Sequence, residues 1–245
     1  FFTRYQEKND FMNMVNLKVQ PRIETTKLPS QSLITKIYNK IKKSLINGDL
    51  KPGEKLKIDD LKNKYDSGHT PIREALTSLV KDGLVERIEQ KGFIASNVSI
   101  KHFNEVLKTR IWIEEIAIKK SMENKEGLEE WEENLILLNH RLSKKDWTEK
   151  YNPENFDSWE MIHKQFHMSL ISRSGSDYLT KFCEQLYDQN LRFRFLLIKN
   201  KKNYLKRNVN IEHQDILNAV LSRDVISAQK NLVKHYKVTD KYFKG

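Results

Sequence analysis

The sequence predicts a mainly α-helical protein with two folded parts. Apolar residues recur at helical spacing over most of the 245 residues, while a segment near residues 84–98 favours strands. Hydrophobic residues make up 38% and charged residues 31% of the chain, which is typical of a globular protein rather than a disordered one. No apolar run reaches the length of a membrane-spanning helix. We expect an N-terminal arm at 1–30, a first folded unit at 31–98 and a helical unit at 99–245.

The arm at residues 1–30 is polar and only weakly periodic. Pro21 and Pro29 interrupt it, and each removes a backbone donor that a helix would need. We therefore expect this segment to be flexible or loosely docked.

Residues 31–98 show the order helix, helix, helix, strand, strand. A Leu/Ile stripe predicts a helix over 31–47, and a short second helix is expected at about 58–65. Thr70 and Pro71 are expected as the N-cap and first residue of a third helix that ends near Lys81. The segments LVERIE and FIASNV flank QKG, which is a hairpin signal. This order is the pattern of a winged helix-turn-helix, whose third helix enters the major groove of DNA.

Residues 99–245 favour helices almost throughout. Periodic apolar residues predict an all-α bundle of six or seven helices of ordinary length. The expected helices cover 101–122, 127–143, 156–173, 177–199, 203–222 and 224–243, with one long loop at 144–155.

The net charge of the chain bears on the class of partner that it binds. The net charge is +11, with a balance of +4 in residues 31–98 (13 basic, 9 acidic) and +5 in residues 99–245 (26 basic, 21 acidic). This excess of positive charge is spread along the chain, and it is compatible with nucleic acid binding without proving it.

Cys183 is the single cysteine, so no intrachain disulfide can form, which suits the cytoplasm. Its apolar helical neighbours predict a core residue rather than a reactive thiol.

The third helix and the hairpin carry the candidate DNA-binding residues. Thr70 and the free amides of the first turn can hold a phosphate. Arg73, one turn into the helix, can grip a guanine or a phosphate with two hydrogen bonds. Gly92, beside Lys91 at the wing, allows the backbone to approach DNA closely. The alternative for Arg73 is an intramolecular salt bridge, with Glu74 or Glu86.

This region resembles the DNA-binding domain of GntR-family bacterial transcription regulators. The similarity runs from Leu33 to about Ser96 and includes GDLKPGEKL, TPIREAL, LVKDGLV and QKGF. Where the family commonly has Val-Ser-Arg before Thr-Pro, this chain has Ser67, Gly68 and His69. Two family DNA contacts are therefore replaced. His69 is expected to contact DNA, with a solvated surface position as the alternative.

Four of the seven histidines fall on three successive predicted helices: His163, His167, His213 and His235. His163 and His167 stand four residues apart, on one helical face. The spacing alone is weak evidence for a metal, because a satisfied core or surface pair has the same pattern. Lys164 and Gln165 exclude the zinc-protease motif, which requires a glutamate. His140 has no histidine one turn away and is expected at the surface.

The segments HKQFHMSLISRSGSDYL and EHQDILNAVLSRDVISAQKNLVKH look like the FCD-type ligand-binding domain of the FadR subfamily of GntR regulators. The resemblance implies a metal site at His167, His213 and His235, with His163 where relatives carry an aspartate. Four neutral imidazoles suit a divalent transition metal, above all Zn²⁺, with Ni²⁺ or Cu²⁺ as alternatives. The fold expected for residues 99–245 is then the FCD-type bundle.

The resemblance also implies an effector and a dimer. We expect a small organic acid to bind at the metal, with Arg110 as its candidate partner and Arg192 and Arg194 as further candidates. The alternative for Arg110 is a buried salt bridge with Glu114. A homodimer follows from the family and from the short DNA site that one recognition helix covers. The leading hypothesis is an effector-controlled regulator, a repressor, that binds operator DNA. The alternatives are a metal-dependent enzyme that uses the histidine cluster, and a DNA-binding protein without an effector.

Overall fold

The computed structural model describes residues 32–145, 153–198 and 207–244. The arm predicted at 1–30 lies outside the described residues, as does most of the predicted loop at 144–155. The described residues form two parts: a winged-helix part, up to residue 98, and a helical bundle that follows it.

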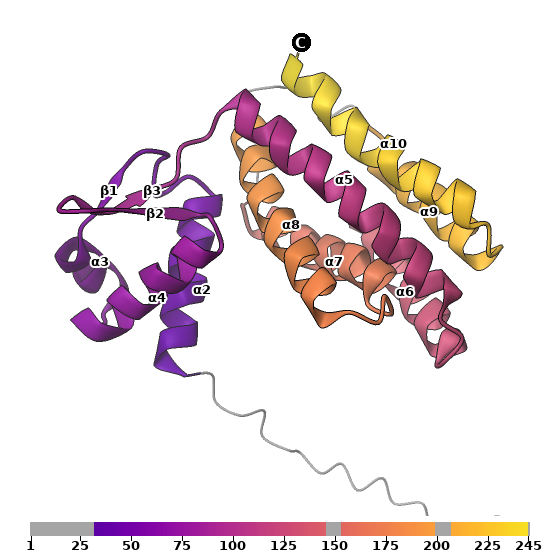
Figure 1. Cartoon of the computed structure of the whole chain (residues 1–245), viewed down its shortest axis with the longest axis horizontal. Helices are drawn as coiled ribbons and strands as arrows, with labels where there is room; N and C mark the ends of the chain where they lie inside the picture. Colours follow the sequence, from indigo (N-terminus) through magenta and orange to yellow (C-terminus); the bar gives the residue numbers. More distant parts are fainter. Residues whose placement is uncertain (1–31, 146–152, 199–206, 245) are drawn as a thin grey trace, which may run out of the picture. The chain divides into compact units, whose positions relative to one another are not determined.

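The winged-helix part contains three helices and three short strands (Figure 1). Its elements are α2 (Leu33–Ile46), β1 (Lys55–Leu56), α3 (Ile58–Tyr65), α4 (His69–Lys81), β2 (Val85–Ile88) and β3 (Gly92–Ala95). The strands form an antiparallel sheet in the order β1-β3-β2. The predicted order of helices and the hairpin is confirmed. The two-residue strand β1 was not predicted, because it is too short to show an alternating pattern.

The start of α4 differs from the prediction by two residues. Gly68 is the N-cap and His69 the first helical residue, so Thr70 lies inside the helix and does not cap it. The prediction placed Pro71 at the first helical position. The first four amides of a helix have no partner within it, so proline is tolerated throughout the first turn and does not fix the boundary.

The hairpin and the wing core follow the sequence pattern. Val85 pairs with Ala95 and Ile88 with Gly92, and the turn between them places Gln90 and Gly92 at positive φ (60° and 85°). Apolar residues from the three helices and from β3 fill the core below the sheet, among them Ile37, Ile41, Leu45, Leu61, Ile72, Leu76, Leu79 and Phe93.

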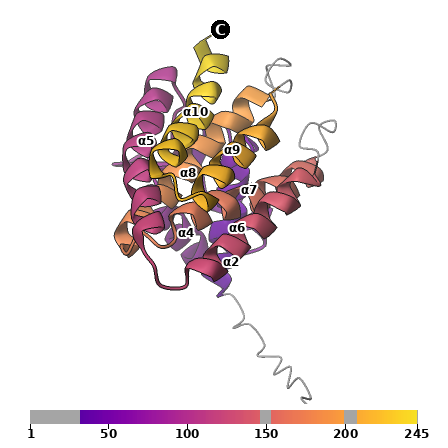
Figure 2. The same cartoon turned by 90° about the vertical axis from the view of Figure 1, so that its right-hand side faces the viewer.

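Residues from Ile100 onward form the bundle, which contains six helices within the described part of the chain (Figure 2). They are α5 (Ile100–Glu123), α6 (Leu128–Ser143), α7 (Pro153–Ile171), α8 (Asp177–Ile198), α9 (Val209–Leu221) and α10 (Val225–Lys244). Helix α10 packs against α5 and α9, and α7 packs against α5, α6 and α8. The all-α bundle expected from the sequence is confirmed.

Two helix starts differ from the expected ones. Helix α7 begins at Pro153, three residues earlier than predicted, which agrees with the preference of proline for a first turn. Helix α9 begins at Val209, where Asn208 caps it by accepting a hydrogen bond from the amide of Ile211.

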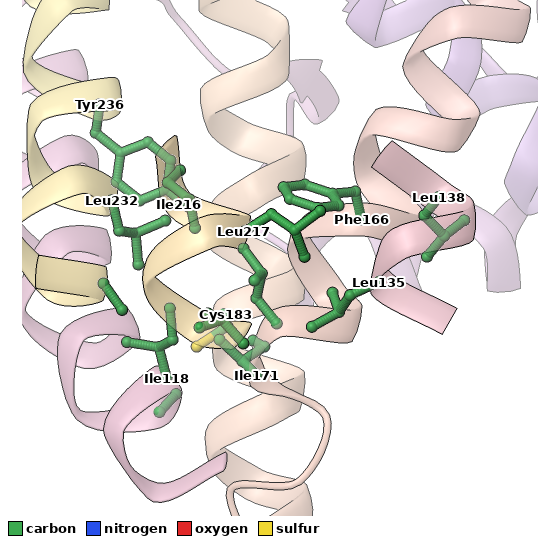
Figure 3. Close-up of a cluster of buried hydrophobic side chains, with 14 of the residues drawn as sticks. Ile118, Leu135, Leu138, Phe166, Ile171, Cys183, Ile216, Leu217, Leu232 and Tyr236 are labelled. Atoms are coloured by element: carbon green, nitrogen blue, oxygen red, sulfur yellow. The ribbon is translucent and has the colours of Figure 1, made fainter. Parts of the chain in front are cut away.

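The bundle core is a continuous set of apolar side chains from all six helices (Figure 3). Phe166, Leu135 and Ile118 are fully buried there, and each such side chain stabilises the fold by roughly 1.5–3 kcal/mol. Cys183 also lies in this core with no exposed surface, as predicted. Over the residues described, no helix combines the length and apolarity that crossing a bilayer requires.

Candidate metal centre and DNA-binding surface

The four histidines singled out in the sequence meet in the bundle. Helix α7 carries His163 and His167, α9 carries His213, and α10 carries His235. All four are buried, and one ring nitrogen from each lies within 4.8 Å of the others. The stripe of α7 that faces the interior therefore brings its two imidazoles against the inner faces of α9 and α10.

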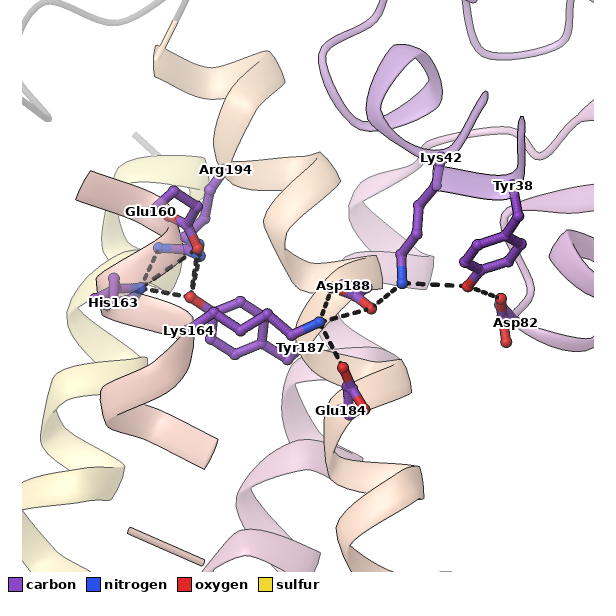
Figure 4. A network of polar contacts seen from close by, with 10 residues as sticks. All are labelled: Tyr38, Lys42, Asp82, Glu160, His163, Lys164, Glu184, Tyr187, Asp188 and Arg194. Atoms are coloured by element: carbon purple, nitrogen blue, oxygen red, sulfur yellow. Dashed lines mark hydrogen bonds and ion pairs between the residues drawn. The ribbon is translucent and has the colours of Figure 1, made fainter. Parts of the chain in front are cut away.

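The hydrogen bonds of His163 determine which nitrogen carries its proton. Its Nδ1 lies 2.6 Å from the hydroxyl of Tyr187, and that hydroxyl donates to Glu160 (Figure 4). Because the tyrosine proton goes to the carboxylate, Nδ1 of His163 donates to the tyrosine oxygen. The proton of the neutral ring is then on Nδ1, and the lone pair is on Nε2.

The position of the ring proton of His167 is determined in the same way, by a tyrosine on another helix. Its Nδ1 lies 3.1 Å from the hydroxyl of Tyr236, which donates to Glu114. The lone pair of His167 is therefore also on Nε2. The two Nε2 atoms of His163 and His167 are 3.1 Å apart. Two lone pairs at this distance repel each other unless a cation lies beside both.

His235 and His213 complete the cluster in different ways. Nδ1 of His235 lies 2.8 Å from Glu212, which leaves Nε2 of that ring as the unprotonated nitrogen. Within the described residues, neither ring nitrogen of His213 has a hydrogen-bond partner. A buried polar group without a partner is costly, and a metal ion would satisfy it.

The donor set fits a divalent transition metal. Zn²⁺ binds imidazole nitrogens at about 2.0–2.1 Å, so two ligands of a tetrahedral site are roughly 3.3 Å apart, close to the observed separation of His163 and His167. Tyr187, Tyr236 and Glu212 hold three of the rings through Nδ1, which is the usual role of groups behind metal-binding histidines.

Burial keeps these imidazoles neutral. It lowers the pKa of His163 to about 4, although the neighbouring Glu160 carboxylate opposes that effect. Burial, together with the neighbouring histidines and arginines, also lowers the pKa of His167, His213 and His235 well below the usual value. Neutral nitrogens are the form that binds a metal.

Three arginine–glutamate pairs surround the neutral cluster, and in each pair the two charges offset each other. They are Arg110 with Glu114 (2.5 Å), Arg194 with Glu160 (2.7 Å) and Arg207 with Glu212 (2.7 Å). Burial disfavours an ionised Glu160, but Arg194 and His163 outweigh it and lower its pKa to about 2. Of the three arginines expected to bind an effector, Arg110 and Arg194 therefore each hold a buried carboxylate of this chain. The buried Arg110–Glu114 pair weighed as an alternative is formed.

The expected DNA-binding residues lie on two exposed features of the winged-helix part. His69, Thr70 and Arg73 occupy the first turns of α4 and are exposed, as are Lys91 and Gly92 at the hairpin tip. Nε2 of His69 lies 3.1 Å from Asp59, and both side chains are open to solvent. The ion pairs among the described residues do not involve Arg73, so neither Glu74 nor Glu86 holds its guanidinium there.

A chain of polar contacts runs from beside the histidine cluster to the end of α4 (Figure 4). Lys164, next to His163 on α7, lies 3.0 Å from Asp188 on α8, and Lys42 of α2 lies 2.5 Å from the same carboxylate. Lys42 also donates to the hydroxyl of Tyr38, which donates to Asp82, the C-cap of α4. The helix that carries the candidate DNA-binding residues is thus joined to the helix that carries two candidate metal ligands.

Two exposed residues one helical turn apart, Trp112 and Ile116, form an apolar patch among charged side chains on the outer face of α5. A pocket of about 490 Å³ lies beside Trp112, between α5 and α10. Its lining is mixed: Leu107, Ile111 and Val233 are apolar, and Asn104, Lys108, Glu115 and Lys237 are polar or charged. Exposed aromatic and aliphatic side chains next to a hollow are typical of a protein–protein contact.

Comparison with known proteins assigns this architecture. Residues 33–94 match the family described as bacterial regulatory proteins, gntR family, and residues 105–238 match the FCD domain. The second match alone covers more than half of the chain.

The chain belongs to the GntR family of regulators with an FCD domain.

Named relatives of this GntR protein are transcription regulators rather than enzymes. It is 33% identical to the uncharacterized HTH-type transcriptional regulator BphR of Paraburkholderia xenovorans, over 84% of this chain and 82% of BphR. It is 30% identical to the HTH-type transcriptional repressor GlaR of Escherichia coli, over 81% of this chain and 90% of GlaR. The GntR protein is thus a DNA-binding transcriptional regulator.

Solved structures show the same fold. E. coli McbR/YncC superposes with a TM-score of 0.66 at 23% identity, over 85% of this chain and 95% of that one. A GntR regulator from Rhodococcus sp. RHA1 superposes with a TM-score of 0.63 at 15% identity, also over 85% and 95% of the two chains.

The groups that orient the histidines of the GntR protein gave little or no signal in its sequence. Glu160 and Glu212 had a weak signal, because one lies a helical turn before His163 and the other precedes His213. Tyr187 and Tyr236 had none, since a tyrosine in an apolar helical stripe looks like any core residue. Only the packing of α8 and α10 against α7 brings their hydroxyls to the imidazoles.

Proposed function

We propose that this protein is a homodimeric, metal-containing transcriptional repressor, and that a small organic acid bound at the metal changes its affinity for operator DNA. The metal would be Zn²⁺, with Ni²⁺ as the alternative, held by His163, His167, His213 and His235. The protein would act in the cytoplasm, where operator DNA lies. The repressor role is supported by the similarity to a relative named as a repressor.

The arrangement of lone pairs carries the metal part of the proposal. Nε2 of His163 and Nε2 of His167 face each other at 3.1 Å, and His213 has two unsatisfied buried nitrogens within the described residues. Hydrogen bonds among the residues that the structure describes relieve neither feature, whereas one divalent cation would relieve both.

The charge balance supports an anionic effector. Each of the three buried arginines near the cluster is matched by one buried or half-buried glutamate. A divalent cation held by four neutral imidazoles would therefore add two uncompensated positive charges. A carboxylate that binds at the metal would offset part of this charge, and Arg110 and Arg194 would share their hydrogen bonds between it and their own glutamates.

The polar chain from α7 to α4 supports coupling between the two sites. A ligand that changes the position of α7 changes the ion pairs of Lys164 with Asp188, and Asp188 also binds Lys42 of the winged-helix part. An effector that binds one arrangement of these ion pairs more tightly than another would shift the placement of the DNA-binding helix.

The apolar face of α5 supports the homodimer. Trp112, Ile116 and the adjoining pocket give a surface that a second copy of α5 and α10 could bury. Two recognition helices would then read two half-sites, which gives affinity that one helix lacks.

Metal analysis and a DNA-binding titration test this proposal together. Protein purified without added metal should contain roughly one metal ion per chain, and the double variant His167→Ala/His213→Ala should contain none. Exposed His140 provides the matched control, because His140→Ala removes an imidazole outside the cluster. DNA binding is measured at one stated salt concentration, before and after chelation, with and without candidate acids.

Two results would count against the proposal. Equal metal content in the double variant and the wild type would refute the metal site. Sequence-specific DNA binding that stays the same with and without metal and with every acid tested would leave a DNA-binding protein without an effector.

A further inference from the structure

Arg192 on α8 is a buried cation that forms no ion pair with any described residue. Its side chain belongs to a residue that is 3% exposed, and within the described residues its Nε and Nη2 atoms have no hydrogen-bond partner. The other strongly buried arginines of the bundle, by contrast, each hold a glutamate: Arg110, Arg194 and Arg207. Burial lowers the pKa of Arg192 to about 10, and no acidic group offsets this effect.

A small cavity lies against Arg192. It has a volume of about 10 Å³, which is the space that one water-sized particle needs. Its walls come from α8, from the segment between α4 and β2, from residues 96–98 between β3 and α5, and from the first turn of α5. The residues that line it are partly apolar, namely Leu84, Val98 and Phe193, and partly polar, namely Ser96, Asn97, His102, Gln189 and Arg192.

The electrostatics of this cavity favour a negative charge. No aspartate or glutamate is among its lining residues, and Arg192 contributes a full positive charge. His102, in the first turn of α5, can offer its imidazole only, because Ser99 already accepts its backbone N–H. Hydroxyl, amide and imidazole groups on the walls add donors that a small anion accepts.

We propose that Arg192 and this cavity bind a small anion, either a halide ion or one oxygen of an inorganic oxyanion such as phosphate. The anion neutralises the buried guanidinium. It also bridges α8 of the bundle to residues 96–98, which connect the winged-helix part to α5. The site is distinct from the histidine cluster, whose arginines already hold carboxylates, and it does not depend on the proposed metal.

Crystals of the full chain grown or soaked in bromide give the most direct test. Bromide replaces chloride and has a strong anomalous signal, so a peak within hydrogen-bond distance of Arg192 supports a halide site. A parallel crystal in phosphate, with density for phosphorus at the cavity mouth, supports the oxyanion. Ordinary water in the cavity under both conditions, or a carboxylate of the chain itself paired with Arg192, overturns the proposal.

Thermal unfolding tests the same site in solution. Unfolding is compared in three proteins: the wild type, Arg192→Gln and the exposed control Arg141→Gln. The ionic strength is kept constant, and the sulfonate anion of the HEPES buffer is replaced by chloride or by phosphate. In the wild type and the control, the preferred anion should raise Tm saturably, by roughly 3 °C or more, because it binds only the folded state. Arg192→Gln should lose this increment. An equal increment in all three proteins would refute specific binding at Arg192.

Discussion

Nε2 of His163 lies 3.1 Å from Nε2 of His167, and each ring donates its Nδ1 proton to a tyrosine hydroxyl. Both Nε2 atoms therefore have a free lone pair, and the two can bind one cation together. His163 also occupies the position where the resemblance implies an aspartate, so it is the residue on which metal choice depends.

Changing His163 tests whether it is a fourth ligand. His163→Asp should keep the metal, since a carboxylate is also a ligand, but should raise the preference for Mn²⁺ relative to Zn²⁺. His163→Leu should weaken metal binding by at least roughly 100-fold. Competition titration with a chromogenic chelator measures both, with His140→Leu as the control. Unchanged affinity in His163→Leu would mean that three histidines suffice.

The Lys42–Asp188 ion pair tests the coupling between the two parts. Lys42→Met should leave the fold intact, because Asp188 keeps its ion pair with Lys164. The change of DNA affinity on metal removal should shrink by roughly twofold to thirtyfold. Fluorescence anisotropy with operator DNA measures this change. Lys181→Met, on the exposed side of α8, is the control. Full metal dependence in Lys42→Met would show that this ion pair carries none of the coupling.

Arg73 tests the DNA-binding surface. Arg73→Ala should weaken specific binding by about 1–3 kcal/mol, which is roughly fivefold to 150-fold, because it removes a contact to a base or a phosphate. The exposed Arg141→Ala on α6 has the same change of charge and should bind DNA like the wild type. A gel-shift titration at fixed salt compares them. Equal weakening in both variants would indicate a loss of general charge only.

Trp112 tests the dimer. Trp112→Glu introduces a charge on the apolar face of α5 and should weaken self-association by roughly thirtyfold or more. Tyr178→Glu changes an exposed aromatic residue of α8 and serves as the control. Size-exclusion chromatography with light scattering, over a dilution series, gives the masses. A Trp112→Glu protein that stays dimeric at every concentration would place the interface elsewhere.

The rate at which the Cys183 thiol reacts at a given pH tests the packing of the bundle. Burial raises the pKa of this thiol from the usual 9.0 to about 12. At pH 8.5 iodoacetamide should therefore react slowly with the folded protein and rapidly in urea, because the thiolate is the nucleophile. The raised pKa stabilises the folded state below pH 9, and this contribution is lost as the pH rises towards 12. Equal alkylation rates in the folded and unfolded protein would show that α8 is not packed as described.

The fold was largely predictable because its signals are local. The apolar stripe of α2 and the hairpin around residues 90–92 each depend on neighbours a few residues away. The prediction of Thr70 as the N-cap of α4 was wrong, because a proline is tolerated anywhere in the first turn and does not mark its first residue. Strand β1 was missed because only its pairing with β3 makes it a strand.

The sequence by itself determined the classes of the two parts and the four histidines, since residue type and helical spacing are properties of the chain alone. Only the tertiary structure decided which nitrogens of His163 and His167 carry protons, because Tyr187 and Tyr236 come from other helices. It also decided that Arg110 and Arg194 hold glutamates while Arg192 holds none within the described residues. Charge pairing in a bundle depends on how helices pack, and no local pattern encodes that packing.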